Sequence, residues 1–133
     1  MSGPLFFVDR SLGRVRLPRL LRADGWSLVT MAEHYGEETG QGVNDTDWLQ
    51  LAGENGWPVL AKDERIRYRP AERTAIIAHG VRAFYLTSGN LTAEHMAEAF
   101  VVNRSAIWDS AVETGPGLFA VTRTSVRQID LAG

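Results

Sequence analysis

The stretch Trp57-Pro58-Val59-Leu60-Ala61-Lys62-Asp63-Glu64-Arg65 decides how the chain is expected to fold. Its apolar run, Val59 to Ala61, is typical of a strand buried inside a sheet. The run ends in the only lysine of the chain, Lys62, followed by Asp63. In open α/β sheets, ligands bind just outside the carboxyl ends of the strands. This stretch therefore predicts a strand that delivers a carboxylate to a ligand-binding edge.

The rest of the chain alternates strand-like and helix-like segments around this strand. We expect further strands at 5–8, 26–30 and 81–86, and a C-terminal β-hairpin formed by 118–122 and 126–131. We expect helices at 17–24, 45–55, 70–79 and 92–112, with a short helix or loop at 31–42. Such alternation predicts the α/β class: a three-layer α/β/α sandwich with a central, mainly parallel sheet. At 133 residues, the chain is expected to be a single domain, 1–133.

Acidic residues follow or separate the predicted strands. Asp9 directly follows the run Leu5–Val8, as Asp63 follows Val59–Ala61, and Asp45 lies at a predicted helix start. Such a residue could simply cap the next helix, but carboxylates brought together repel one another unless a cation neutralises them. Oxygen ligands without thiolate or imidazole favour Mg²⁺ or Mn²⁺. Asp47, Glu37 and Glu38 are further candidate ligands, although solvated surface positions explain the two glutamates at least as well.

Basic residues border these acids in the sequence. Ten of the fourteen lysines and arginines fall within 10–22 and 62–73, whereas 23–61 holds seven acids and no lysine or arginine. Both basic windows begin beside a strand-end aspartate, with Arg10 and with Lys62 and Arg65. An acidic centre with a basic rim suits a polyanion held over metal ions. Neighbours on a strand point to opposite faces, so Lys62 and Asp63 reach one site only if the local geometry changes.

Several function classes lack their signatures. The chain has no cysteine, which excludes disulfides, thiolate metal sites and thiol nucleophiles. It has no Walker loop, no Gly-X-Gly-X-X-Gly and no Gly-X-Ser-X-Gly motif. No apolar stretch approaches the roughly 18 residues of a membrane span, and the N-terminus shows no signal peptide. We therefore expect a cytoplasmic protein with no membrane partner.

In order and spacing, these motifs resemble those of the PIN-like nucleases. The matching pieces are Phe6-Phe7-Val8-Asp9, then Asp45-Thr46-Asp47-Trp48-Leu49-Gln50-Leu51-Ala52, then Val59-Leu60-Ala61-Lys62-Asp63. Asp45 stands seven residues before Ala52, as in the family pattern, and Ala61 replaces the usual threonine. The likeness is greatest to small bacterial proteins related to VapC toxins and to the Mut-seven C-terminal group. The stretch Leu86-Thr87-Ser88-Gly89-Asn90 also resembles this subgroup.

The resemblance implies a metal-dependent endoribonuclease, the toxin of a VapBC-type toxin–antitoxin pair. Asp9, Asp45 and Asp63 would hold Mg²⁺ or Mn²⁺, with Asp47 as a further candidate. The implied partners are an RNA substrate and a cognate antitoxin, and a homodimer is a further hypothesis. The expected contacts with substrate phosphate come from Arg10, Lys62, Arg65, Ser88 and Asn90.

Two alternatives stay open at this stage. A non-catalytic PIN-like module would bind RNA or protein through the same edge, because no fourth acid is firmly placed. A receiver-like phospho-acceptor domain would also place Asp9, Asp63 and either Thr87 or Ser88 at strand ends. That design needs a lysine after the fifth strand, where this chain has none.

Overall fold

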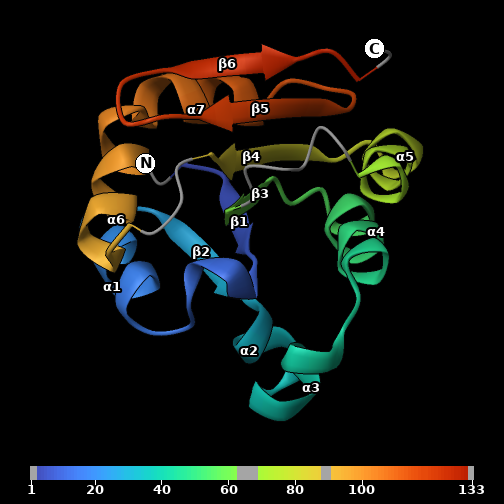
Figure 1. Ribbon diagram of the computed structural model, residues 1–133, viewed down its shortest axis with the longest axis horizontal. Coiled ribbons are helices and arrows are strands. Elements are labelled where there is room, and N and C mark those ends of the chain that lie inside the picture. Colours follow the sequence, from blue (N-terminus) through green and yellow to red (C-terminus); the bar gives the residue numbers. More distant parts are fainter. Residues whose placement is uncertain (1–2, 63–68, 88–90, 132–133) are drawn as a thin grey trace.

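The computed structural model describes residues 3–62, 69–87 and 91–131 (Figure 1). The strands are β1 (Leu5–Val8), β2 (Ser27–Thr30), β3 (Val59–Lys62), β4 (Arg82–Leu86), β5 (Gly117–Val121) and β6 (Val126–Ile129). The helices are a short 3-10 helix η1 (Arg10–Leu12), α1 (Arg16–Ala23), α2 (Met31–Tyr35), α3 (Glu37–Gly42), α4 (Asp45–Asn55), α5 (Pro70–His79), α6 (Ala93–Val102) and α7 (Arg104–Ala111).

These strands form one sheet in the order β2-β1-β3-β4-β5-β6. The neighbours from β2 to β5 are parallel, and β6 pairs antiparallel with β5. The order reverses between β1 and β3, which lie side by side although most of the N-terminal half of the chain separates them. In open parallel sheets, this reversal opens a crevice at the carboxyl ends of the strands.

Alternating side chains of the sheet build two cores. On one face, Phe6, Leu60 and Phe84 pack with residues of α1, α6 and α7. On the other face, Phe7 packs with Trp48 of α4 and Ile76 of α5. Figure 1 shows α1 and α6 on one side of the sheet and α4 and α5 on the other. The predicted three-layer α/β/α sandwich with a mainly parallel sheet and a C-terminal hairpin is confirmed.

The structure corrects one predicted helix and shows how a second segment, left open between a helix and a loop, is folded. The segment 92–112 was expected to be one helix, but it forms α6 and α7, which meet at Asn103. The buried Asn103 Nδ2 donates to the Ala99 carbonyl at 2.8 Å and to the Thr122 carbonyl at 2.9 Å. Such side-chain bonds to backbone groups compete with a continuous helix. The segment 31–42 forms two short helices, α2 and α3.

None of the helices in the described part of the chain has the length and apolar character that crossing a membrane requires.

Candidate active site

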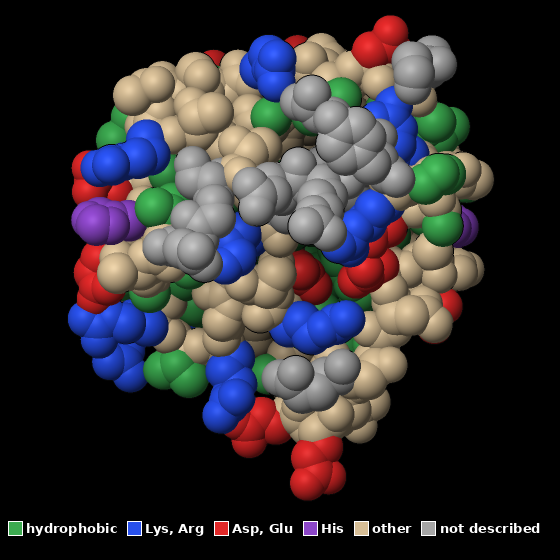
Figure 2. All heavy atoms as spheres, in the orientation of Figure 1, with side chains coloured by type: hydrophobic (Ala, Val, Ile, Leu, Met, Phe, Trp, Pro, Cys, Tyr) green, Lys and Arg blue, Asp and Glu red, His purple; other side chains and the backbone are tan. Residues whose placement is uncertain are grey.

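A polar cavity of about 320 Å³ opens at the carboxyl end of the sheet. It lies where β1, β3 and β4 end and where α4 and α5 begin. Its lining combines acids with basic and hydroxyl-bearing side chains: Asp9, Arg10, Ser11, Asp45, Trp48, Lys62, Arg69, Glu72 and Tyr85. Figure 2 shows acidic side chains near the centre of this face, with lysine and arginine side chains around them.

Asp9 both caps a helix and keeps one oxygen for other chemistry. Its Oδ2 accepts a hydrogen bond from the Ser11 backbone N–H at 3.3 Å, which caps η1. Its Oδ1 is buried and has no hydrogen-bond partner among the described residues. Burial raises the pKa of Asp9, although the hydrogen bonds from Ser11 offset part of this effect. A buried carboxylate oxygen without a donor is costly, so this atom marks a position suited to a cation.

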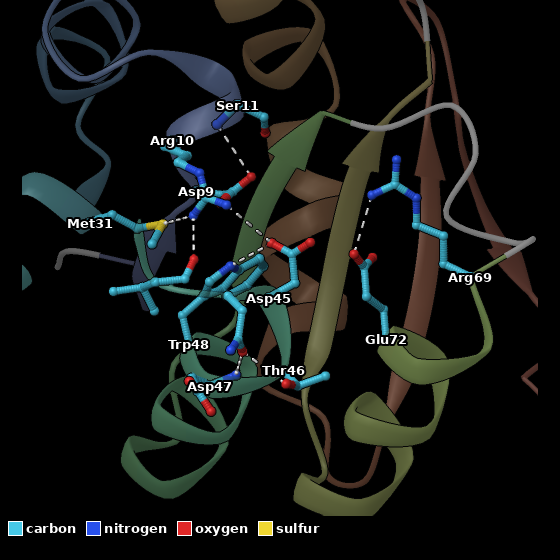
Figure 3. A network of polar contacts seen from close by, with 12 residues as sticks. Asp9, Arg10, Ser11, Met31, Asp45, Thr46, Asp47, Trp48, Arg69 and Glu72 are labelled. Carbon is cyan, nitrogen blue, oxygen red and sulfur yellow. Dashed lines mark hydrogen bonds and ion pairs between the residues drawn. The ribbon is translucent and has the colours of Figure 1, made fainter. Parts of the chain in front are cut away.

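Asp45 is held against the same cavity by its own helix. Asn44 caps α4 by accepting a hydrogen bond from Asp47 N–H at 3.1 Å, which leaves Asp45 at the first helical position. Trp48, one turn later, is buried against Phe7 and donates from Nε1 to Asp45 Oδ1 at 2.9 Å. A core tryptophan therefore orients this carboxylate (Figure 3).

Arg10 lies between the acids and the helices beside them. Its Nη1 donates to the Val43 carbonyl at 2.9 Å and lies 3.7 Å from the Met31 sulfur. Its Nη2 lies 3.8 Å from Asp45 Oδ1, and both side chains are about one third exposed (32% each). The guanidinium is thus fixed beside Asp45 and still faces solvent.

Glu72 is an acid of this cavity that sequence reasoning missed. It lies in the first turn of α5 and is only 7% exposed. Burial, together with a hydrogen bond to Asp45 and the charge of that residue, raises the pKa of Glu72 to about 8. Burial alone would also raise the pKa of Asp45. Hydrogen bonds from Glu72 and Trp48 outweigh the effect of burial, together with the charges of Arg10 and Arg69, so the pKa of Asp45 is lowered. The pKa of Glu72 is thus raised and that of Asp45 lowered, so Glu72 is the carboxyl group of this pair that keeps its proton to higher pH.

Arg69 and Ser11 make two further hydrogen bonds at this cavity. Arg69 precedes α5 and donates to Glu72 Oε1 at 3.3 Å (Figure 3). Ser11 Oγ accepts a hydrogen bond from the Lys62 backbone N–H at 3.0 Å, which ties the end of β3 to the turn after β1. The Lys62 side chain lines the cavity with Asp9, so a strand-end lysine does reach this site.

The remaining predicted residues divide into two groups. Asp47 is exposed outside the cavity, Glu38 is exposed on α3, and Glu37 forms an ion pair with Arg14 in a neighbouring cavity. Four predicted site residues lie outside the described residues: Asp63, Arg65, Ser88 and Asn90.

The donor chemistry of the cavity fits a hard divalent cation. Asp9 and Asp45 offer carboxylate oxygens and Glu72 a carboxyl group, and Asp9 Oδ1 is buried with no donor from the residues that the structure describes. Such oxygens are the preferred ligands of Mg²⁺ and Mn²⁺. Within residues 3–62, 69–87 and 91–131, no group of three or more acidic or histidine side chains is spaced to hold a metal ion by itself.

A weak sequence signal could have indicated Glu72. Pro70 predicts a helix start, and an acid in the first turn of a helix that follows β3 belongs near the same sheet edge. However, its distance from Asp45 in the sequence gives no hint that the two side chains share a proton. The presence of Trp48, Arg69 and Tyr85 in the cavity likewise follows only from the packing of α4, α5 and β4.

The chain belongs to the PIN-like domain family, because the profile of that family, described as "PIN like domain", matches residues 4–88. The chain is also 37% identical over 123 residues to "Putative ribonuclease VapC45" of Mycobacterium tuberculosis (strain ATCC 25618 / H37Rv). That alignment covers 92% of this chain and 89% of the relative. A comparison with solved structures gives no match. The predicted resemblance to PIN-like nucleases of the VapC type is confirmed, and the receiver-like alternative is set aside.

Proposed function

We propose that the chain is a metal-dependent endoribonuclease and the toxin of a VapBC-type pair. The observation that carries the proposal is the cavity at the carboxyl ends of β1 and β3, where a buried Asp9 oxygen, which has no donor within the described part of the chain, lies near Asp45. The name of the mycobacterial relative supports ribonuclease activity.

In the proposed site, Asp9, Asp45 and Asp63 hold Mg²⁺ or Mn²⁺. Asp63 directly follows Lys62, the last residue of β3, and β3 pairs with β1. A divalent cation supplies charge stabilisation for the in-line attack of water on phosphorus. Glu72 adds a carboxyl group and orients Asp45 through their hydrogen bond.

The basic residues of the cavity bind and orient the substrate in this proposal. Arg10, Lys62 and Arg69 line the cavity beside the acids. Arginine presents paired N–H donors that match phosphate oxygens, and lysine acts as a point charge. These groups offset the repulsion between the acids and an RNA backbone, so the phosphodiester can approach the carboxylates.

The replacement Asp9→Asn tests the metal site directly. We expect the variant to keep its fold but to lose Mn²⁺ binding by calorimetry and cleavage of single-stranded RNA, because the amide cannot supply an anionic ligand. Asp63→Asn is expected to behave in the same way. Asp109→Asn, on the exposed surface of α7 away from the cavity, is the matched control and is expected to retain both properties.

Retained cleavage in either Asp9→Asn or Asp63→Asn would refute the proposed mechanism. Wild-type protein that binds no Mn²⁺ would instead favour the non-catalytic RNA- or protein-binding module. One observation favours that second candidate: the Arg10 guanidinium pairs with Asp45 and supplies positive charge beside it.

The antitoxin proposal has its own test. The protein encoded beside this chain should co-purify with it and suppress its RNA cleavage. A neighbour that neither binds nor inhibits would refute the toxin–antitoxin assignment and leave the nuclease proposal intact.

A further inference from the structure

Arg10 directly follows Asp9 and reaches Asp45 at the start of α4 (Figure 3). Its Nη1 is anchored by a 2.9 Å hydrogen bond to the Val43 carbonyl. Its Nη2 lies 3.8 Å from Asp45 Oδ1, beyond the roughly 3.2 Å limit of an N–H···O hydrogen bond. The contact with Asp45 is therefore electrostatic, and the guanidinium can leave this carboxylate without breaking a hydrogen bond to it.

The orientation of Asp45 does not depend on Arg10. The buried Trp48 donates from Nε1 to the same Oδ1 atom at 2.9 Å. Asn44, the cap of α4, fixes the backbone at the first helical position. Removing the charge of Arg10 therefore takes a cation away from Asp45 and leaves the bonds that hold the carboxylate in place.

The charge of Arg10 has opposite effects on the two ligands of the proposed site. Beside Asp45, it offsets the repulsion between neighbouring carboxylates and opposes the arrival of a divalent cation. Toward a phosphodiester, the same guanidinium offers N–H donors that match phosphate oxygens. The side chains of Arg10 and Asp45 are each 32% exposed, so both can meet a ligand that enters the cavity from solvent.

We propose that Arg10 exchanges partners during binding: it neutralises Asp45 in the metal-free protein and turns to the substrate phosphate when a divalent cation binds the acids. The inference rests on the proposed nuclease function. A substrate that draws Arg10 away from Asp45 raises the affinity for the metal ion, and by linkage the metal ion raises the affinity for the substrate. Arg10 thereby couples the binding of metal and RNA.

The replacement Arg10→Gln removes the charge and keeps an amide donor for the Val43 carbonyl. We expect Mn²⁺ binding, measured by calorimetry, to become roughly three- to tenfold tighter, because a charge beside a partly exposed ligand is lost. We expect the KM for single-stranded RNA to rise roughly tenfold, because a charge-assisted bond to phosphate is lost. Arg10→Lys keeps the charge and should bind Mn²⁺ as the wild type does.

Arg104→Gln is the matched control for the change in net charge. Arg104 pairs with Asp24 at 3.1 Å, lies on α7 and does not line the acidic cavity. We expect this variant to keep the wild-type Mn²⁺ affinity and KM. In the wild type, the Arg10 Nε–H resonance, assigned by its loss in Arg10→Lys, should shift as Mg²⁺ saturates the site, because the guanidinium leaves Asp45.

The opposite signs of the two effects separate this coupling from a purely structural role, which would weaken both metal and RNA binding. Unchanged or weaker Mn²⁺ affinity in Arg10→Gln would overturn the exchange of partners while leaving the nuclease function standing. An Arg10 resonance that does not move with Mg²⁺ would overturn it as well, without any replacement of the arginine. Wild-type protein that binds no Mn²⁺ and cleaves no RNA contradicts the nuclease function and, with it, this inference.

Discussion

Single residues at this site serve the core and the chemistry together. Trp48 is 1% exposed and packs on Phe7, yet its indole N–H holds Asp45. Asp9 caps η1 with one oxygen and leaves the other without a donor among the described residues. The helix-capping role of Asp9 and its proposed role as a metal ligand are therefore compatible, because they use different oxygens.

The shared proton of Glu72 and Asp45 gives a pH-dependent stability. The pKa of Glu72 rises from 4.5 in an ordinary environment to about 8 in the folded chain. The folded state then binds this proton more tightly than the unfolded chain, so the free energy of unfolding falls as pH rises between these values. Asp45, whose pKa is lowered, titrates below this window.

We therefore expect Glu72→Gln to flatten this dependence in metal-free protein, because the amide keeps a donor for Asp45 and does not titrate. Urea unfolding in the presence of EDTA, from about pH 5 to about pH 8, measures the effect. Glu38→Gln, on the exposed surface of α3, should follow the wild-type curve. A Glu72→Gln curve as steep as that of the wild type would show that Glu72 is not the titrating group.

At the scale of elements, the site depends on where helices begin. Asp45 is the first residue of α4, and Glu72 lies in the first turn of α5. Both helix N-termini face the strand ends, where their backbone N–H groups and dipoles favour negative charge. The Asn44 cap that starts α4 and Pro70 at the start of α5 therefore also position the acids.

The effect of removing the α4 cap can be compared with the effect of removing the cap of α6. Asn44→Ala removes the hydrogen bond to Asp47 N–H and is expected to cost about 1 kcal/mol of stability. Because Asp45 is the next residue, we also expect roughly tenfold weaker Mn²⁺ binding by calorimetry, the size of loss typical when a group supporting a ligand is removed. Thr92→Ala removes the equivalent bond to His95 N–H at the start of α6 and should cost stability alone. Equal Mn²⁺ affinities in the two variants would contradict this role of the α4 cap.

At the scale of the whole molecule, the site exists because distant elements meet at one edge. The parallel pairing of β1 with β3 brings the residues after both strands together. The packing of α4 against α5 then places Asp45 and Glu72 in the same cavity. Gly53 permits this approach, because a Cβ there would lie 2.4 Å from the His79 carbonyl oxygen and 2.7 Å from the His79 Cβ.

Gly53→Ala should push α4 and α5 apart. We expect a loss of about 1–3 kcal/mol in the free energy of unfolding, the usual cost of overpacking, measured by urea denaturation. Gly42→Ala in α3, where a Cβ meets nothing within 4 Å, is the matched control and should be neutral or slightly stabilising. A Gly53→Ala protein as stable as the control would show that the two helices can separate without cost.

The sequence by itself determined the strands, most helix starts and the strand-end acids. Apolar runs such as Val59–Ala61 and stop signals such as Gly80 act locally, so they can be read without the fold. The order and spacing of Asp9, Asp45 and Asp63 also sufficed to predict the family.

Only the tertiary structure decided which side chains share the cavity. Glu72 joins the site through the contact of α4 with α5, and the break at Asn103 depends on the Thr122 carbonyl of a distant segment. Asp9 Oδ1 is buried and has no donor among the described residues, which depends on how the elements pack around it. Proximity, burial and shared protons arise between segments that are far apart along the chain, and local sequence patterns do not record them.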